Sequence, residues 1–142
     1  MVTTITPELR KDSHELVTAV ESDMNIFVHA AAWDHEPETG RWRLVLLSKA
    51  TARLGPTALF TSIGRILSEH EFGMSLEDIT VAIPGVNEGV TQMASFVGVS
   101  RSPVLEPPPE FVNTSFNGSI VSHAWLLWSV PPIPFPGKRR PI

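Results

Sequence analysis

The sequence contains no cysteine. A chain without thiols cannot form disulfides, use a thiolate nucleophile or build a thiolate zinc site, although this absence does not identify a cellular compartment. No apolar run approaches the roughly 20 residues that are needed to cross a bilayer. Residues 1–10 lack the basic and apolar regions of a signal peptide. We therefore expect a soluble, cytoplasmic protein.

Motifs that indicate catalysis or metal binding are also missing. The chain has no Gly-x-Ser-x-Gly elbow, no His-Glu-x-x-His zinc motif and no Gly-x-x-x-x-Gly-Lys phosphate loop. Two triplets, Asp34-His35-Glu36 and Glu69-His70-Glu71, set a histidine between acids, but adjacent side chains point in different directions and do not converge on one site. His29 and His123 lie among apolar residues and are interpreted as core histidines. We expect no metal and no cofactor, and the catalytic residues remain unassigned.

The charge is divided unequally along the chain. Residues 1–130 hold 8 Lys and Arg against all 15 Asp and Glu, whereas Lys138, Arg139 and Arg140 add three positive charges near the C-terminus. An acidic body disfavours general nucleic-acid binding, because duplex affinity depends on neutralising phosphates. The length of 142 residues suits one domain over 1–130. Residues 131–142 are rich in proline and are expected to form an extended or disordered basic tail, available to a protein partner.

The most regular helical pattern begins at Gly55-Pro56. Proline suits the first helical position, since its missing N–H would have no partner there. Five apolar residues then share one helix face, and Gly73 can provide the left-handed turn that ends the helix. These five residues are Leu59, Phe60, Ile63, Ile66 and Leu67.

The remaining patterns predict an α+β fold with an antiparallel or mixed sheet of about five strands. The element order is helix, strand, strand, helix, strand, helix, strand, strand. Asn117-Gly118 is typical of a type I′ turn joining the last two strands. The expected ranges are a helix over 6–21, strands over 24–33 and 41–48, a helix over 55–73, a strand over 79–83, a helix over 87–97, and strands over 111–116 and 119–130.

A resemblance supports this fold. The strand Trp42-Arg43-Leu44-Val45, the helix start at Gly55-Pro56 and the late aromatic strand at 124–128 resemble a family of small bacterial α+β proteins that has no assigned activity. The resemblance covers residues 24–130. It implies a fold and no activity.

Several strands are apolar on both faces, so either helices cover both faces of the sheet or one face is an oligomer interface. Four tryptophans lie on these strands, and large aromatic residues are difficult to hide in a small monomer. The leading hypothesis is a non-enzymatic interaction module that forms a homo-oligomer through the apolar sheet surface. The interface candidates are Trp33, Trp42, Trp125 and Trp128.

The alternative hypothesis is a small enzyme or binding protein for an anionic ligand that carries phosphate or carboxylate. No acidic residue occurs between Glu38 and Glu69, whereas five cations fall there. The N-terminus of the helix at Gly55 offers free N–H groups to an anion. The candidate anion-binding residues are Arg41, Arg43, Arg53, Gly55 and Thr57.

Overall fold

The computed structural model describes residues 2, 4–85, 88–101 and 108–130. Over these residues the chain has the α+β fold and the element order predicted from the sequence, with a short α-helix and one turn of 3-10 helix in addition. The elements are α1 (Pro7–Met24), β1 (Ala30–His35), β2 (Trp42–Leu47), α2 (Ala50–Leu54), α3 (Pro56–Glu69), η1 (Leu76–Asp78), β3 (Ile79–Ala82), α4 (Glu88–Phe96), β4 (Glu110–Phe116) and β5 (Ser119–Ser129).

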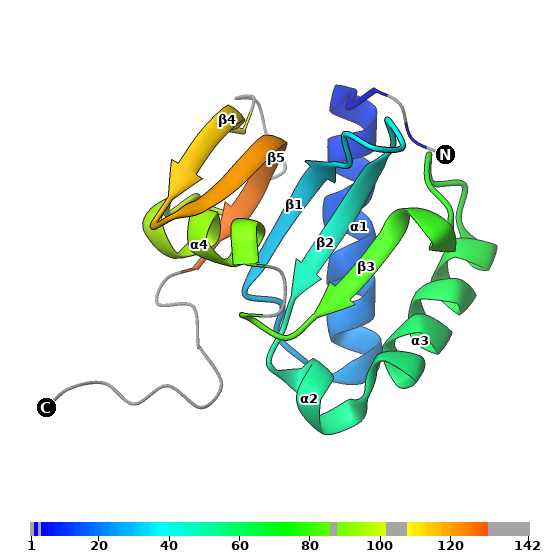
Figure 1. The fold of residues 1–142 in the computed structure, drawn as a ribbon. Helices are drawn as coiled ribbons and strands as arrows, with labels where there is room; N and C mark the ends of the chain where they lie inside the picture. Colours follow the sequence, from blue (N-terminus) through cyan, green and yellow to red (C-terminus); the bar gives the residue numbers. More distant parts are fainter. Residues whose placement is uncertain (1, 3, 86–87, 102–107, 131–142) are drawn as a thin grey trace, which may run out of the picture.

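The five strands form one mixed sheet in the order β3-β2-β1-β5-β4. β1 pairs antiparallel with β2 and with β5, and β4 pairs antiparallel with β5. Among the strands that the structure describes, β2 and β3 form the one parallel pair, because α2 and α3 return the chain to the sheet end where β2 begins. β1 is therefore the central strand, and β3 and β4 are the edges (Figure 1).

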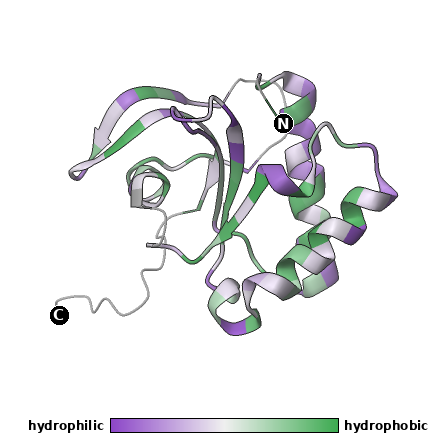
Figure 2. Ribbon diagram, turned by 45° about the vertical axis from the view of Figure 1, so that its right-hand side comes forward, coloured by the Kyte–Doolittle hydropathy of each residue, from purple (hydrophilic) through white to green (hydrophobic). Residues whose placement is uncertain are grey.

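Helices cover the two faces of the sheet. α1 and α3 pack on one face and α4 packs on the other (Figure 1). The strands that lie between the helices are mostly hydrophobic (Figure 2). Alternation of side chains along β1 sends Ala31 and Trp33 into the core below α1 and α3, and Ala30 and Ala32 into the core below α4. The two-sided apolar strands are thus explained by helices on both faces.

The helix starts follow the sequence signals. Thr6 is the N-cap of α1, and its hydroxyl accepts a hydrogen bond from the Leu9 N–H at 3.1 Å. Proline occupies the first position of α1 and of α3. Ser75 and Asp78 form a reciprocal capping box at η1.

Three boundaries differ from prediction. α1 continues to Met24, so the first strand starts at Ala30 rather than at residue 24, and Asn25 ends the helix in the left-handed conformation with φ 53°. α3 stops at Glu69 and not at Gly73, because His70 is already extended. The link before α3 contains the short helix α2, which is not among the predicted elements.

The final hairpin has the predicted turn. Asn117 and Gly118 both have positive φ, at 50° and 85°, which is the requirement of the type I′ turn. β5 lies between β1 and β4, as its apolar faces indicated. The proposed tail, residues 131–142, lies outside the described residues. Among the described residues, no helix is both long enough and apolar enough to cross a membrane.

Candidate functional site

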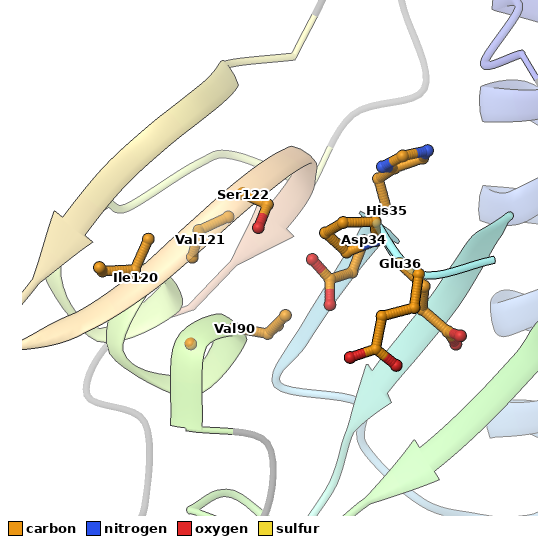
Figure 3. Close-up of a pocket in the computed structure, with 10 residues that line it drawn as sticks. Asp34, His35, Glu36, Val90, Ile120, Val121 and Ser122 are labelled. Atoms are coloured by element: carbon orange, nitrogen blue, oxygen red, sulfur yellow. The ribbon is translucent and has the colours of Figure 1, made fainter. Parts of the chain in front are cut away.

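An open pocket of about 400 Å³ lies where three segments meet. The end of β1 and the loop after it form one wall, the first turn of α4 forms the floor, and the start of β5 forms the opposite wall (Figure 3). Its lining residues are Asp34, His35, Glu36, Pro37, Glu38, Gly89, Val90, Ile120, Val121 and Ser122.

Successive side chains of β1 point to opposite faces of the sheet, and this determines which residues of the Asp34-His35-Glu36 triplet line the pocket. Asp34 continues the face of Ala30 and Ala32, so its carboxylate extends toward α4 and β5, whereas the His35 ring points away (Figure 3). The triplet therefore does not converge on one point, in agreement with the sequence argument. It instead places a carboxylate on one face of the sheet and an imidazole on the other.

Asp34 is partly buried and electrostatically unfavourable as an anion. Burial, and then the nearby negative charge of Glu36, raise the pKa of the Asp34 carboxyl from 3.8 to about 6. Among the described residues, no cation and no hydrogen-bond donor lies within bonding distance of this carboxyl. At neutral pH Asp34 is thus mainly an anion, and no cation among the described residues pairs with it.

Glu36, in contrast, has bonding partners within the protein. Its carboxylate forms an ion pair with the Arg43 guanidinium and accepts a hydrogen bond from the Thr39 hydroxyl at 3.2 Å. Arg43 also donates to the Thr80 hydroxyl on the neighbouring strand at 3.4 Å. Glu36 consequently adds negative charge to the pocket while its own hydrogen-bonding capacity is used within the sheet.

The other side of the pocket is apolar. Val90 and Val121 are 1% and 3% exposed and form the hydrophobic base, whereas Ile120 is 70% exposed at the rim. Gly89 allows α4 to approach β5 closely, since a Cβ there would lie 3.4 Å from the Ile120 carbonyl oxygen. The pocket therefore combines one unpaired carboxylate with an apolar wall, an arrangement that can hold a cationic group attached to a hydrocarbon body or exchange a proton with a bound molecule.

A second cluster lies on the opposite face of the same sheet end. His35 and His123 both contact the Trp42 ring, with ring centroids 5.0 and 4.7 Å apart. His123 Nε2 lies 2.5 Å from a Glu110 carboxylate oxygen. His123 is thus a half-exposed surface residue bound to a carboxylate and not the core histidine that the sequence indicated, because β4 brings Glu110 beside it.

The structure does not bring the five candidate anion-binding residues together. Arg41 and Arg43 lie at the start of β2, whereas Arg53, Gly55 and Thr57 lie beyond its end, in α2 and at the start of α3. Four residues of β2 follow Arg43, so about 13 Å of strand lies between it and the segment that carries the second group.

The two arginines at the start of β2 also have bonding partners within the protein. Arg41 donates to the Glu77 carbonyl at 2.9 Å and lies 3.9 Å from Asp78, while Arg43 is bound to Glu36 and Thr80. The absence of acidic residues between Glu38 and Glu69 in the sequence did not reveal these partners, since they come from other segments.

The tryptophans proposed for an interface are largely core residues. Trp33 and Trp128 are fully buried and Trp42 is 6% exposed. Trp125 is partly buried, and the Arg10 guanidinium lies 5.5 Å from the centre of its ring. Trp33 also donates from Nε1 to the buried Ser13 hydroxyl at 2.9 Å. Helices cover both faces of the sheet, which is the first of the two explanations that the apolar strands left open.

Sequence reasoning noticed Asp34 but did not identify its site. The available signal was the spacing of Asp34 and Glu36, which places both on one strand face, two and four residues after Ala32. The other walls come from residues more than 50 positions later and could not be inferred from spacing. Within the described part of the chain, no group of three or more His, Cys, Asp or Glu residues is arranged to hold a metal ion.

Comparison of the chain with protein-family models, with curated proteins and with solved structures gives no match.

Proposed function

We propose that the Asp34 pocket binds a small organic cation, an amine or a guanidinium attached to an apolar body. The supporting observation is the Asp34 carboxylate, which lies in a pocket of about 400 Å³ without a positive partner among the described residues. A charged group of a ligand would supply that partner, and its hydrocarbon part would lie against Val90 and Ile120. Such sites combine an apolar lining with a few placed polar groups.

The charge distribution supports a cation over an anion. The acidic residues of the lining are Asp34, Glu36 and Glu38, and no lysine or arginine is among the lining residues. An anionic ligand would be repelled by these carboxylates at short range. A neutral ligand would leave Asp34 charged and desolvated, which is unfavourable.

A panel of alkylamines and alkylguanidines of increasing chain length tests this proposal by calorimetry and thermal shift. A ligand that binds only the folded state raises the melting temperature by mass action. We expect binding that strengthens with chain length and is lost in Asp34→Asn. Glu71→Gln, which removes an exposed carboxylate outside the pocket, is the matched control and should bind as the parent does. Equal binding by parent and Asp34→Asn would refute the proposal.

A second candidate is self-association through the β4–β5 hairpin. β4 is an edge strand, and Val112 and Ile120 on this hairpin are 56% and 70% exposed. An edge strand with exposed apolar side chains can pair with another copy of itself. This version of the homo-oligomer hypothesis uses the hairpin in place of the tryptophans.

Light scattering at two protein concentrations tests the second candidate. A dimer that becomes monomeric in Val112→Lys would support it. Phe96→Lys, at an exposed apolar position in α4, is the control and should leave the mass unchanged. A monomeric parent at both concentrations would exclude this candidate.

A further inference from the structure

The residue opposite Asp34 on the neighbouring strand is a cation. In the antiparallel β1–β2 pair, Asp34 lies directly across from Arg43. Arg43 is two residues before Val45, which is buried on the α4 side of the sheet, so the Arg43 side chain emerges on the same face as Asp34. The Cβ atoms of two residues that lie opposite each other are about 5 Å apart. The Asp34 carboxylate is therefore within reach of the Arg43 guanidinium after a change of side-chain rotamer.

In this structure the Arg43 guanidinium contacts two groups other than Asp34. It forms an ion pair with Glu36 and donates to the Thr80 hydroxyl at 3.4 Å. Both contacts are weak restraints, since the ion pair is 36% and 34% exposed and 3.4 Å is long for a hydrogen bond. The Arg43 Nε is buried and makes no aligned hydrogen bond to any described residue. The guanidinium is thus held only loosely beside Glu36.

One mobile cation therefore lies beside two carboxylates. Asp34 and Glu36 are two residues apart and on one face of the sheet, so a single guanidinium can reach either of them. Arg41, the other arginine at the start of β2, lies 3.9 Å from Asp78. A side chain that is partly exposed to solvent changes rotamer within nanoseconds. Arg43 can consequently exchange between the two acids without a change in the backbone.

From this geometry we infer that Arg43 is an internal competitor for the Asp34 pocket and sets the affinity of the pocket for cations. With Arg43 on Glu36 the pocket accepts an external amine, and with Arg43 on Asp34 the pocket is closed. The apparent association constant is the intrinsic constant multiplied by the fraction of molecules in which Asp34 is free. Because the tethered guanidinium acts at a high effective concentration, only a cation that gains further contacts along the apolar wall displaces it.

The inference rests on the proposed function, since it names the residue that regulates the same cation site. The first test compares two full-length variants that each remove one arginine from the start of β2. Without the competitor, Arg43→Gln should bind hexylamine several-fold more tightly than the parent does in calorimetry. Arg41→Gln removes an equal charge two residues away and is the matched control, in which we expect a much smaller change. Equal affinities in the two variants would overturn the inference.

The second test leaves every charge in place. Thr80→Val removes the hydroxyl that holds Arg43 on the Glu36 side, so the guanidinium should spend more time on Asp34. We expect the hexylamine affinity to fall several-fold. The pKa of the Asp34 carboxyl, followed by carbon NMR without ligand, should also fall, since an adjacent cation lowers the pKa of a carboxyl. Thr114→Val, on β4, is the control and should change neither quantity.

The outcomes separate this inference from the proposed function. In the Arg43→Gln background, Thr80→Val should leave both the affinity and the Asp34 pKa unchanged, because the exchanging cation is absent. An unchanged affinity and pKa on introducing Thr80→Val into the parent would overturn the inference. If hexylamine binds equally to the parent and to Arg43→Gln, the competitor is excluded while the proposed function stands. If hexylamine binds to neither protein, both proposals are refuted.

Discussion

The carboxyl of Asp34 lowers the stability of the fold that contains it. Its folded-state pKa of about 6 lies above the value of 3.8 for an accessible aspartate. Between these pH values the folded chain binds more protons than the unfolded chain, so the free energy of unfolding falls as the pH rises through this window. A residue that reduces stability in this way is expected at a site where it serves binding or chemistry.

Asp34→Asn should consequently stabilise the protein. The amide has nearly the same shape and carries no charge to desolvate, so we expect the free energy of unfolding above pH 6 to increase by about 2 kcal/mol. Urea denaturation at pH 5 and pH 8 measures this change, and the gain should be larger at pH 8. A variant that is no more stable than the parent at pH 8 would show that Asp34 is not electrostatically unfavourable.

His14 produces a pH dependence of the opposite sign. The ring is buried against Trp128, with ring centroids 4.7 Å apart. Burial, and then the charge of Arg101, lower the pKa of His14 from 6.5 to about 4. Between these values the unfolded chain binds more protons, so stability is lost as the pH falls from 6.5 toward 4.

The variant His14→Phe keeps an aromatic ring against Trp128 and removes this titration. In the Asp34→Asn background, where the opposing contribution is absent, we expect unfolding free energy to rise with pH between 4 and 6.5, and His14→Phe to flatten that rise. Denaturation at four pH values across the window provides the comparison. An unchanged slope would assign the pH dependence to another group.

At the level of elements, one ion pair fixes the segment that follows α4. Arg101 Nη1 donates to Glu21 at 2.8 Å, a second contact joins the same two groups, and the guanidinium lies 4.5 Å from the centre of the Trp128 ring. The side chains of Arg101 and Glu21 are only 23% and 15% exposed. This pair therefore attaches the chain after α4 to the C-terminal part of α1.

We expect Glu21→Gln to destabilise the fold by about 2 kcal/mol, because the partly buried Arg101 loses its counter-ion. Glu15→Gln, which breaks the exposed Lys11–Glu15 pair of 3.9 Å, should change stability by less than about 0.5 kcal/mol. Thermal unfolding of the two variants side by side gives the answer. If both variants lose less than about 0.5 kcal/mol of stability, the Glu21–Arg101 pair contributes no more to stability than an exposed ion pair does.

Two glycines should respond in opposite ways to alanine. Gly64 lies within α3, and a Cβ there would meet only Leu76 Cδ2 at 3.8 Å, so Gly64→Ala should stabilise by about 0.5–1 kcal/mol. Gly118 has φ 85° in the final turn, and Gly118→Ala should cost about 1 kcal/mol. The shifts in melting temperature test both signs, and a stabilising Gly118→Ala would contradict the turn assignment.

For the whole molecule, one sheet is shared by two cores. The core below α1 and α3 and the core below α4 lie on opposite faces of the same strands. Since β1 contributes buried residues to both, loss of either core should expose the other. We expect urea unfolding monitored by tryptophan fluorescence and by far-ultraviolet circular dichroism to coincide. Two separated transitions would show that the cores unfold independently.

The sequence by itself determined the features that depend on neighbouring residues. Thr6-Pro7 and Gly55-Pro56 mark helix starts because capping and the fixed φ of proline act within one turn. Asn117-Gly118 forms its hairpin because both residues accept positive φ. Periodicity over 10 to 15 residues likewise identifies amphipathic elements whichever partner they meet, and it gave the correct fold class.

Only the tertiary structure decided which residues share a site. The arginines before and after β2 appeared as one positive block, but a strand keeps them apart and distant residues neutralise Arg41 and Arg43. The tryptophans were interpreted as candidates for an oligomer interface, because the sequence does not decide between such an interface and helices on both faces. The pKa of the Asp34 carboxyl is raised first by burial, to which α4 and β5 contribute from far along the chain, and then by the charge of Glu36. The burial of a residue and the charges around it depend on all of its neighbours in space. The pocket therefore exists only once the sheet has assembled.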